Sequence, residues 1–456
     1  MDTNTYISFF GAAGTVTGSR HLIETHGKKI LIDCGLFQGL RELRDLNWKP
    51  FPVKPSEIDA VILTHAHLDH TGYLPLLGKN GFKGPVYLTP PTFDLATIIL
   101  NDSAHIQVEE AEKANKEGYG KHKPALPLYK PEDVKRILPL FKRIALNTPT
   151  ELFPGFEFTY RMAGHILGAC FVEINCFGKR IVFSGDLGRP DSLTLFPPDK
   201  LSECDYLILE STYGNRDHEP THPMDELARE IREAHERGGN LIIPSFAVGR
   251  TQELILMINR LKEENKIPSI PVVLDSPMGA DATEAFCNYP AWHRLSVAES
   301  EHLCSHVFIT RSIRDTHKVL DTPDSKIVIA GSGMLTGGRI LYYLEKYLPE
   351  KSNTVLLVGY QAEGTRGWRL QNGEPEIKVW GNYIKVKARI NQITTLSAHA
   401  GKSELVAWAG GSKKVPRKIF LVHGEPEAAK ALKKTLEEKM ETEVVIPGLN
   451  QRELMG

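Results

Sequence analysis

The sequence of 456 residues has no long apolar run and no recognisable export signal. No hydrophobic stretch approaches the roughly 18 residues that a membrane-spanning helix needs. The opening residues, MDTNTYISFFGAAG, place no basic segment ahead of an apolar core, as a secretory signal peptide would require. We therefore expect a cytoplasmic protein with no membrane among its partners.

Cysteine is scarce and follows no pattern. The chain has neither a CxxC pair nor a dense cysteine framework, and its six cysteines are Cys34, Cys170, Cys176, Cys204, Cys287 and Cys304. This spacing favours reduced thiols in a cytoplasm over a disulfide scaffold.

An excess of charge of one sign is also missing. Lys and Arg number 55 and Asp and Glu number 56, which leaves a net charge of -1. Because this balance attracts no polyanion, a polyanionic ligand would need a local basic face or bound metal ions.

What is present begins with an ordinary globular composition, 41% hydrophobic and 24% charged, for which one or two domains are expected. The first part reads as strands and tight turns, except for a charged, largely helical stretch at 92–145 that we interpret as a solvated insertion. From about residue 209, apolar strands alternate with amphipathic helices, which indicates βαβ units on a parallel sheet. The sequence therefore predicts an α/β protein of two domains and leaves open whether the second is inserted in the first.

The densest cluster of chemically active side chains lies in THAHLDHTGYLP, Thr64 to Pro75. Imidazole and carboxylate groups are the ligands of Zn²⁺ and similar hydrolytic metals. His65 and His67 are two residues apart at the end of a predicted strand, so they can face the same side. Asp69 and His70 follow a bend and fit a second ion.

Three further candidates share one context, in which an apolar strand runs into a polar residue beside glycine. They are His165 in MAGHILG, Asp186 in VFSGDLG and His423 in FLVHGEP. A site at one edge of a sheet produces this repeated context. Two metal ions about 3.5–4 Å apart need such additional ligands, usually with a bridging carboxylate.

The motif HAHLDH, followed in order by His165, Asp186 and His423, resembles the metallo-β-lactamase superfamily. The resemblance implies an αββα sandwich, in which two facing sheets have helices outside, and a dinuclear metal site at one sheet edge. It implies one metal bound by His65, His67 and His165, a second bound by Asp69, His70 and His423, and Asp186 as the bridge between them.

The metals that this resemblance implies are two Zn²⁺ per chain, with Mn²⁺ as the alternative ion. Asp33 in LIDCG matches the first motif of the superfamily. There it would accept a hydrogen bond from a metal-bound imidazole and orient it. The alternative is a turn aspartate ahead of Gly35.

Later motifs narrow the family. Glu210 in LILESTYGNRDH, His399 in LSAHAG and His423 in LVHGEP resemble the three signatures of the β-CASP nucleases. That family includes the nuclease of mRNA 3′-end cleavage, RNase J and shorter prokaryotic relatives. The resemblance implies a metallo-β-lactamase domain at 1–208 and 387–456, with an inserted β-CASP domain at 209–386 that is built on a parallel sheet flanked by helices.

The activity that the resemblance implies is hydrolysis of phosphodiester bonds in single-stranded RNA, leaving 5′-phosphate and 3′-hydroxyl ends. A hydroxide activated by the metals would attack phosphorus, with Asp69 counted among the catalytic residues. His399 would protonate the leaving oxygen while Glu210 keeps it cationic. Taken singly, Glu210 could instead cap a loop and His399 could be a core histidine.

Six residues are expected to contact the RNA backbone. The Gly-rich stretch SGMLTGG and the helix start after Gly249 could offer N–H groups to phosphates, although tight turns explain them equally well. For the arginines, surface salt bridges are an equal alternative. The six are Ser397, Arg250, Ser332, Gly333, Arg339 and Arg366.

Several alternatives stay open at this stage. A DNA-acting relative would tend to have Val in place of His423, and a non-catalytic scaffold would have lost metal ligands. Gly401 stands where the family commonly has Asp, which puts a hydrogen bond near His399 in doubt. Endonuclease or 5′–3′ exonuclease preference, and assembly into a homodimer, are not decided.

Overall fold

The computed structural model describes residues 3–117, 123–219, 223–305, 307–359 and 361–456, and the side chains of residues 304 and 305 are not described. The chain divides into two compact units. The sandwich unit comprises Met1–Ser192, Phe196–Asp217 and His399–Gly456, and the inserted unit comprises Leu193–Leu195 and His218–Ala398. This division falls at 217/218 and 398/399, whereas the predicted limits were 208/209 and 386/387. Strand β11 (Tyr206–Glu210) of the sandwich unit crosses the first predicted limit, and strand β19 (Arg389–Gln392) of the inserted unit lies after the second.

The first sheet of the sandwich unit has seven strands. Antiparallel pairing joins the strands from β22 to β3, and parallel pairing joins those from β3 to β6. In spatial order the strands are β22 (Arg452–Met455), β1 (Thr5–Phe9), β2 (His21–Thr25), β3 (Lys28–Ile32), β4 (Ala60–Ile62), β5 (Val86–Leu88) and β6 (Phe141–Arg143).

The second sheet also has seven strands, contributed by both ends of the unit's sequence. The pairs β10–β11, β11–β20 and β20–β21 are parallel, and the remaining pairs are antiparallel. The order is β21 (Glu443–Val445), β20 (Lys418–Val422), β11 (Tyr206–Glu210), β10 (Lys179–Phe183), β9 (Cys170–Cys176), β8 (Phe156–Met162) and β7 (Thr150–Phe153).

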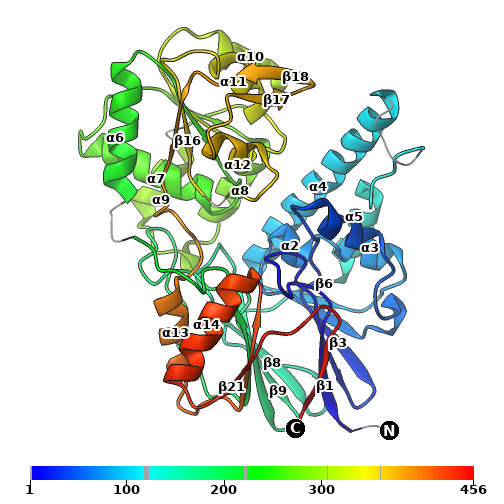
Figure 1. Ribbon diagram of the computed structural model, residues 1–456. Coiled ribbons are helices and arrows are strands. Elements are labelled where there is room, and N and C mark those ends of the chain that lie inside the picture. The colour runs from blue at the N-terminus through cyan, green and yellow to red at the C-terminus, as the bar shows by residue number, and fades with distance from the viewer. Residues whose placement is uncertain (1–2, 118–122, 220–222, 306, 360) are drawn as a thin grey trace. The chain divides into compact units, whose positions relative to one another are not determined.

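The two sheets face each other across a buried aromatic and aliphatic layer. The rings of Phe9 and Phe420, one from each sheet, lie 5.2 Å apart, and those of Tyr87 and Phe158 lie 5.4 Å apart. Helices cover the outer faces (Figure 1), with α3 (Leu74–Lys79), α4 (Pro90–Glu117) and α5 (Pro131–Ile137) beside the first sheet and α13 (Lys402–Gly410) and α14 (Pro426–Lys439) beside the second. The predicted αββα sandwich is confirmed.

The stretch at 92–145 is more than the solvated insertion that its charge predicted. Leu95, Ile99 and Leu100 of α4 are buried. Its end supplies β6, which pairs with β5. The interpretation was wrong for these parts because charged residues on the outer face of a long helix hide its narrow apolar stripe.

The inserted unit contains a six-stranded sheet in which every pair is parallel. Its order is β14 (Phe308–Ile309), β13 (Val272–Asp275), β15 (Ile327–Ala330), β12 (Leu241–Pro244), β16 (Thr354–Leu357) and β19 (Arg389–Gln392). Helix α6 (Pro223–Glu236) precedes the first of these strands. The helices between them include α7 (Arg250–Glu263), α8 (Pro277–Cys287), α9 (Val297–Ser305), α10 (Ile313–Asp321), α11 (Ile340–Tyr347) and α12 (Arg366–Gln371). The predicted β-CASP architecture, strands alternating with helices, is confirmed.

Two other sequence expectations meet the structure here. Cys34, Cys170, Cys176 and Cys204 are free and buried, as expected. Cys287 is disulfide-bonded, so the expectation of reduced thiols is wrong for it; Cys304 has its side chain outside the described residues. Within the described ranges, no helix has the length and apolar composition needed to cross a membrane.

Candidate metal centre and acid pair

The predicted ligands gather where strands of the sandwich unit end. The HAHLDH segment follows β4, Asp186 follows β10, Glu210 is the last residue of β11, and His423 follows β20. Since β10, β11 and β20 are parallel neighbours, their carboxyl ends meet at one edge of the second sheet. Alignment of strands far apart in sequence therefore creates the centre.

Glycines beside these residues allow the loops to approach one another closely. A Cβ on Gly35 would lie 1.6 Å from the Asp69 carbonyl oxygen, and one on Gly188 would lie 1.9 Å from the Gly164 carbonyl oxygen. No other residue fits at either position without moving backbone.

The first group of ligands has its nitrogen atoms turned toward one another. His65 Nε2 lies 3.1 Å from His67 Nδ1, and His165 Nε2 lies 3.3 Å from that same nitrogen. Asp186 Oδ2 is 3.5 Å from His65 Nε2 and 3.6 Å from His165 Nε2. Among the residues that the structure describes, these four side chains form one of three groups of carboxylates and imidazoles close enough to hold an ion.

The second group lies on the other side of Asp186. His423 Nε2 is 3.2 Å from Asp69 Oδ2, and His70 Nε2 is 3.9 Å from the same oxygen. Asp186 Oδ1 is 3.4 Å from His70 Nε2 and 3.5 Å from His423 Nδ1. Asp186 thus directs one oxygen to each group, the arrangement expected of a bridging carboxylate.

The unsatisfied atoms of this centre fit metal ions. His70 Nε2 and Asp186 Oδ1 are buried and have no hydrogen-bond partner among the described residues. Leaving such groups unpaired is costly, and a cation between them would remove the cost. The donor set of imidazoles and carboxylates is that of Zn²⁺ or Mn²⁺.

Asp33 orients one ligand through its two oxygens. Oδ1 accepts from the Thr64 N–H at 2.8 Å, and Oδ2 accepts from the Thr64 hydroxyl at 2.9 Å. Oδ2 also lies 2.8 Å from His70 Nδ1. An Nδ1–H that donates to Asp33 leaves Nε2 as the lone-pair atom turned toward the centre.

Thr64 was missed by the sequence reasoning. Its hydroxyl lies 3.1 Å from His65 Nδ1 and 3.4 Å from His70 Nδ1, so it touches one ligand of each group. Its position directly before HAHLDH was the available signal.

Burial and charge set the protonation of the ligands. Burial lowers the pKa of His65 well below its ordinary value, which leaves the neutral imidazole that a metal requires. Burial opposes ionisation of Asp69, but the hydrogen bond from His423 and the neighbouring imidazoles outweigh it and lower its pKa to about 2.

A separate pair, Glu210 and His399, lies beside the ligands. His399 Nδ1 is 3.3 Å from the Glu210 carboxylate, which is fully buried and accepts the Leu187 N–H at 2.6 Å. Burial lowers the pKa of His399, but the charge of Glu210 and its hydrogen bond outweigh burial and raise that pKa to about 9. The His399 ring is also 4.4 Å from that of His165. The pair therefore keeps a protonated imidazole beside the predicted ligands, and its role as an acid stays a prediction.

Comparison with known proteins places this geometry in a family. Residues 14–236 match the metallo-β-lactamase superfamily, residues 251–370 the Beta-Casp domain, and residues 383–447 the Zn-dependent metallo-hydrolase RNA specificity domain. A ribonuclease of Thermus thermophilus is 36% identical across 94% of this chain and 95% of its own length. The chain belongs to the β-CASP family of metallo-β-lactamase-fold hydrolases.

Other relatives agree with this β-CASP assignment. Transcription termination factor FttA of Methanocaldococcus jannaschii is 32% identical over 92% of this chain and 67% of its own length. An RNase J-like protein of the same organism is 32% identical over 92% of each chain. The crystal structure of an Enterococcus faecalis protein is 12% identical in sequence and superimposes with a TM-score of 0.56 over 99% of this chain and 100% of its own. At this level of identity the likeness concerns the fold alone.

This β-CASP chain departs from the usual family pattern at Gly401. The Gly401 N–H donates to the Glu404 carboxylate at 2.6 Å at the start of α13. Asp217 accepts from the Ser403 N–H at 2.7 Å and from its hydroxyl at 2.8 Å. The carboxylates of Glu404 and Asp217 therefore hold the start of α13, the helix that follows His399, without an Asp at position 401.

The predicted RNA contacts all belong to the inserted β-CASP unit, and three arginines among them already have protein partners. Arg250 pairs with Glu253 and donates to the Leu396 carbonyl at 2.6 Å. Arg339 donates to Asp275 at 2.6 Å. Arg366 donates to the carbonyls of Lys378, Leu335 and Thr336. These contacts stabilise the unit, and an RNA role for the arginines stays a prediction.

The other predicted contacts lie in loops of the same unit. The Ser332 hydroxyl accepts from the N–H groups of Thr336 and Gly337 at 3.0 and 3.4 Å, which folds the Gly-rich loop on itself. A Cβ on Gly333 would lie 2.7 Å from the Phe246 ring. Ser397 lies two residues before His399 in the sequence. Their contact with phosphate stays a prediction.

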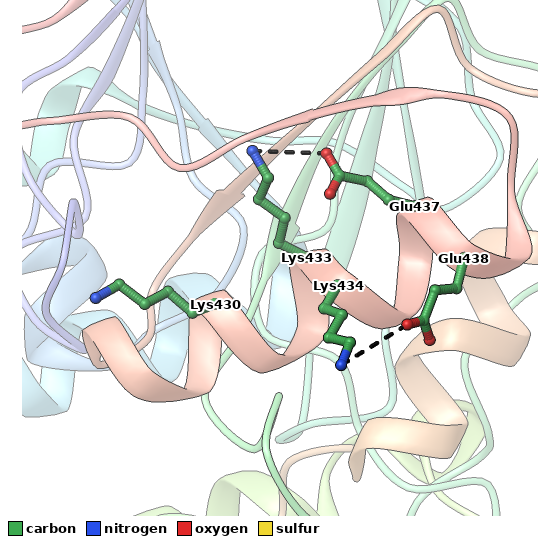
Figure 2. A pocket seen from close by; sticks show the side chains of 5 residues that line it. All are labelled: Lys430, Lys433, Lys434, Glu437 and Glu438. Atoms are coloured by element: carbon green, nitrogen blue, oxygen red, sulfur yellow. Dashed lines mark ion pairs between the residues drawn. The ribbon is translucent and has the colours of Figure 1, made fainter.

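A shallow hollow elsewhere on the sandwich unit offers no comparable chemistry. Figure 2 shows its lining on α14: Lys430, Lys433, Lys434, Glu437 and Glu438. Lys433 pairs with Glu437 at 3.5 Å and Lys434 with Glu438 at 3.9 Å, one helical turn apart. Such pairs are typical of a solvated helix face, so we assign it no site.

Proposed function

We propose that this protein is a metal-dependent ribonuclease that hydrolyses phosphodiester bonds of single-stranded RNA and leaves 5′-phosphate and 3′-hydroxyl ends. The observation that carries the proposal is the pair of buried Glu210 and half-buried His399 beside the ligand cluster. A metal cluster alone serves many hydrolases, but an alkoxide leaving group needs a proton, and this pair holds one.

Seven residues would hold two Zn²⁺, with Mn²⁺ as the alternative. Two ions bound there would lower the pKa of a water molecule and offset negative charge on the phosphoryl oxygens. Asp186 would serve both ions because its two oxygens face different groups. The seven are His65, His67, Asp69, His70, His165, Asp186 and His423.

His399 would give its proton to the leaving 3′ oxygen. The bond between phosphorus and that oxygen breaks, so the upstream product ends in a 3′-hydroxyl and the phosphate stays on the downstream 5′ end. Glu210 is the positioning residue, because it holds Nδ1 and favours the charged imidazole. A nearby bound cation would lower the pKa of His399 from its high value by repulsion, which would ease proton release.

RNA is favoured over DNA by His423 and by the relatives. One relative is named a ribonuclease and another an RNase J-like protein. The matched RNA specificity domain covers residues 383–447, which include both His399 and His423. A cytoplasmic location and a homodimeric state stay predictions.

The experiment that tests the mechanism compares two leaving groups. His399→Ala should lower kcat on single-stranded RNA by about 10²–10⁴, because a ribose alkoxide cannot leave unprotonated. The same variant should hydrolyse bis(p-nitrophenyl) phosphate within a few-fold of the wild type, because p-nitrophenolate needs no proton. Equal losses on both substrates would contradict the general-acid role.

Substrate class is tested on labelled oligonucleotides of one sequence in RNA and DNA form. We expect cleavage of RNA with Zn²⁺ or Mn²⁺, and none after chelation. A preference for DNA would overturn the proposal. The pattern on 5′-blocked and 5′-phosphorylated RNA would distinguish endonuclease from 5′–3′ exonuclease action.

A further inference from the structure

The hairpin of β17 (Glu376–Val379) and β18 (Asn382–Lys385) in the inserted unit has two unlike faces. The strands are antiparallel, with Lys378 opposite Tyr383 and Glu376 opposite Lys385. Residues directly opposite each other point to the same side. Figure 1 shows the hairpin as a ribbon separate from the six-stranded sheet, near α11 and α12.

The inner face anchors the hairpin. Ile377 and Val379 are 0% exposed and belong to the core cluster around α11, with Ile384 packed against it. The Arg366 guanidinium donates to the Lys378 carbonyl at 2.6 Å. The ring of Trp380, at the turn, meets that of Tyr342 edge-on at 4.5 Å. The backbone is thus fixed without help from the outer face.

The outer face carries an aromatic ring among lysines. Tyr383 is 64% exposed, and the Lys378 ammonium lies 5.9 Å from the centre of its ring. Lys385 and Lys387 are exposed. None of these three lysines forms an ion pair with any described residue. One glutamate, Glu376, accompanies them, so this face is locally basic on a chain whose net charge is -1.

We propose that this outer face binds single-stranded RNA, with a base stacked on Tyr383 and phosphates held by Lys378 and Lys385. Stacking on an exposed aromatic ring is the sequence-tolerant way to hold an unpaired base, and lysines beside it follow the backbone. A basic face of this kind is what a nearly neutral chain needs to attract a polyanion. The choice of RNA rests on the proposed function, while the surface is outside the metal centre.

Binding is measured with a fluorescently labelled 20-nucleotide uridine RNA by anisotropy. The protein is the full-length, metal-loaded chain carrying His399→Ala, so that the RNA stays intact. Tyr383→Ala should weaken affinity about tenfold, within the range for loss of one stacked base. Tyr383→Phe should bind within about twofold of the parent, because the ring is kept and only the hydroxyl is lost.

The lysines are tested by salt dependence. The Lys378→Ala/Lys385→Ala double variant should reduce the slope of log affinity against log salt by about 1.4, or roughly 0.7 for each phosphate contact on a single strand. The matched control is Lys430→Ala/Lys434→Ala, which removes the same charge from α14 (Figure 2). It should leave the slope unchanged.

The hairpin substitutions placed alone in the wild-type chain should leave bis(p-nitrophenyl) phosphate hydrolysis unchanged. The inference is overturned if Tyr383→Ala and the lysine double variant bind RNA as the parent does. It is also overturned if the α14 control loses as much of the salt slope as the hairpin double variant, or if the hairpin substitutions reduce small-diester hydrolysis as much as RNA binding. RNA binding through the hairpin without cleavage by the wild type would refute the proposed nuclease alone. Cleavage with hairpin-insensitive binding would refute this inference alone.

Discussion

At the scale of single residues, orientation of ligands by their neighbours is the main theme. Asp33 holds the Thr64 N–H and hydroxyl and lies 2.8 Å from His70 Nδ1. All three side chains are buried, so no water competes for these bonds. Metal affinity should therefore depend on a carboxylate that touches no metal.

Asp33→Ala should lower metal affinity by about 10–100-fold, because His70 loses the acceptor that fixes its ring and tautomer. Chelator competition with Zn²⁺ on the purified protein measures this loss. The matched control is Asp59→Ala, since Asp59 also pairs with a basic side chain of the same sheet, Lys28, but at the surface. Equal Zn²⁺ affinity of Asp33→Ala and the wild type would show that Thr64 alone is enough to orient His70.

At the scale of elements, the start of α9 illustrates a cap tied to a second helix. Ser296 and Glu299 form a reciprocal capping pair, with 2.9 Å from the Ser296 N–H to the carboxylate and 3.2 Å from the Glu299 N–H to the hydroxyl. Arg260 of α7 donates to the same carboxylate. The hydrogen bond from the Ser296 backbone N–H lowers the pKa of Glu299, and Arg260 lowers it further. Together they outweigh the slight burial that would raise this pKa, and they bring it from 4.5 to about 2.

Glu299→Gln should lower Tm at pH 7 by about 2–4 °C, the effect of roughly 1 kcal/mol in a unit of this size. The folded pKa lies below the unfolded value, so the stabilisation is complete above about pH 4.5 and is lost as pH falls toward about 2. The Tm difference should therefore shrink between pH 5 and pH 3. Glu284→Gln, at an exposed position of α8, is the control. A pH-independent difference for Glu299→Gln would contradict the linkage.

At the scale of the whole molecule, the two units divide the chemistry between them. Every predicted metal ligand, together with Glu210 and His399, lies in the sandwich unit. The hairpin at β17–β18 and its core lie in the inserted unit. Metal binding should thus stabilise one unit directly.

Chelation should deprotect backbone amides unevenly. Ions present at about 100 times their Kd add roughly 2.7 kcal/mol to the folded state. Hydrogen exchange followed by mass spectrometry should show faster exchange in peptides from β10, β11 and β20 after metal removal, and unchanged exchange in β12 and β13. Added Zn²⁺ should restore protection. Uniform loss across both units would contradict this division.

The residues that bear the chemistry could be identified from sequence because local rules govern them. His165, Asp186 and His423 each lie beside a glycine after an apolar strand, and that pattern indicates a strand end at a sheet edge. The partners of Arg339 could not be identified in this way. Arg339 precedes α11 and meets Asp275, which lies 64 residues earlier at the end of β13. Only the register of strands far apart in sequence decides such a contact.

Side-chain chemistry and short periodicity are local, so the type of each candidate ligand, the alternation of strands and helices, and the likeness to a family could be read from the sequence. Tertiary structure decided the grouping. His165 is 98 residues from His67, yet their nitrogens are 3.3 Å apart. It also decided that α4 helps to form the core and that Tyr383 stands among lysines on a free face. Long-range packing fixes these relations, and no local pattern encodes it.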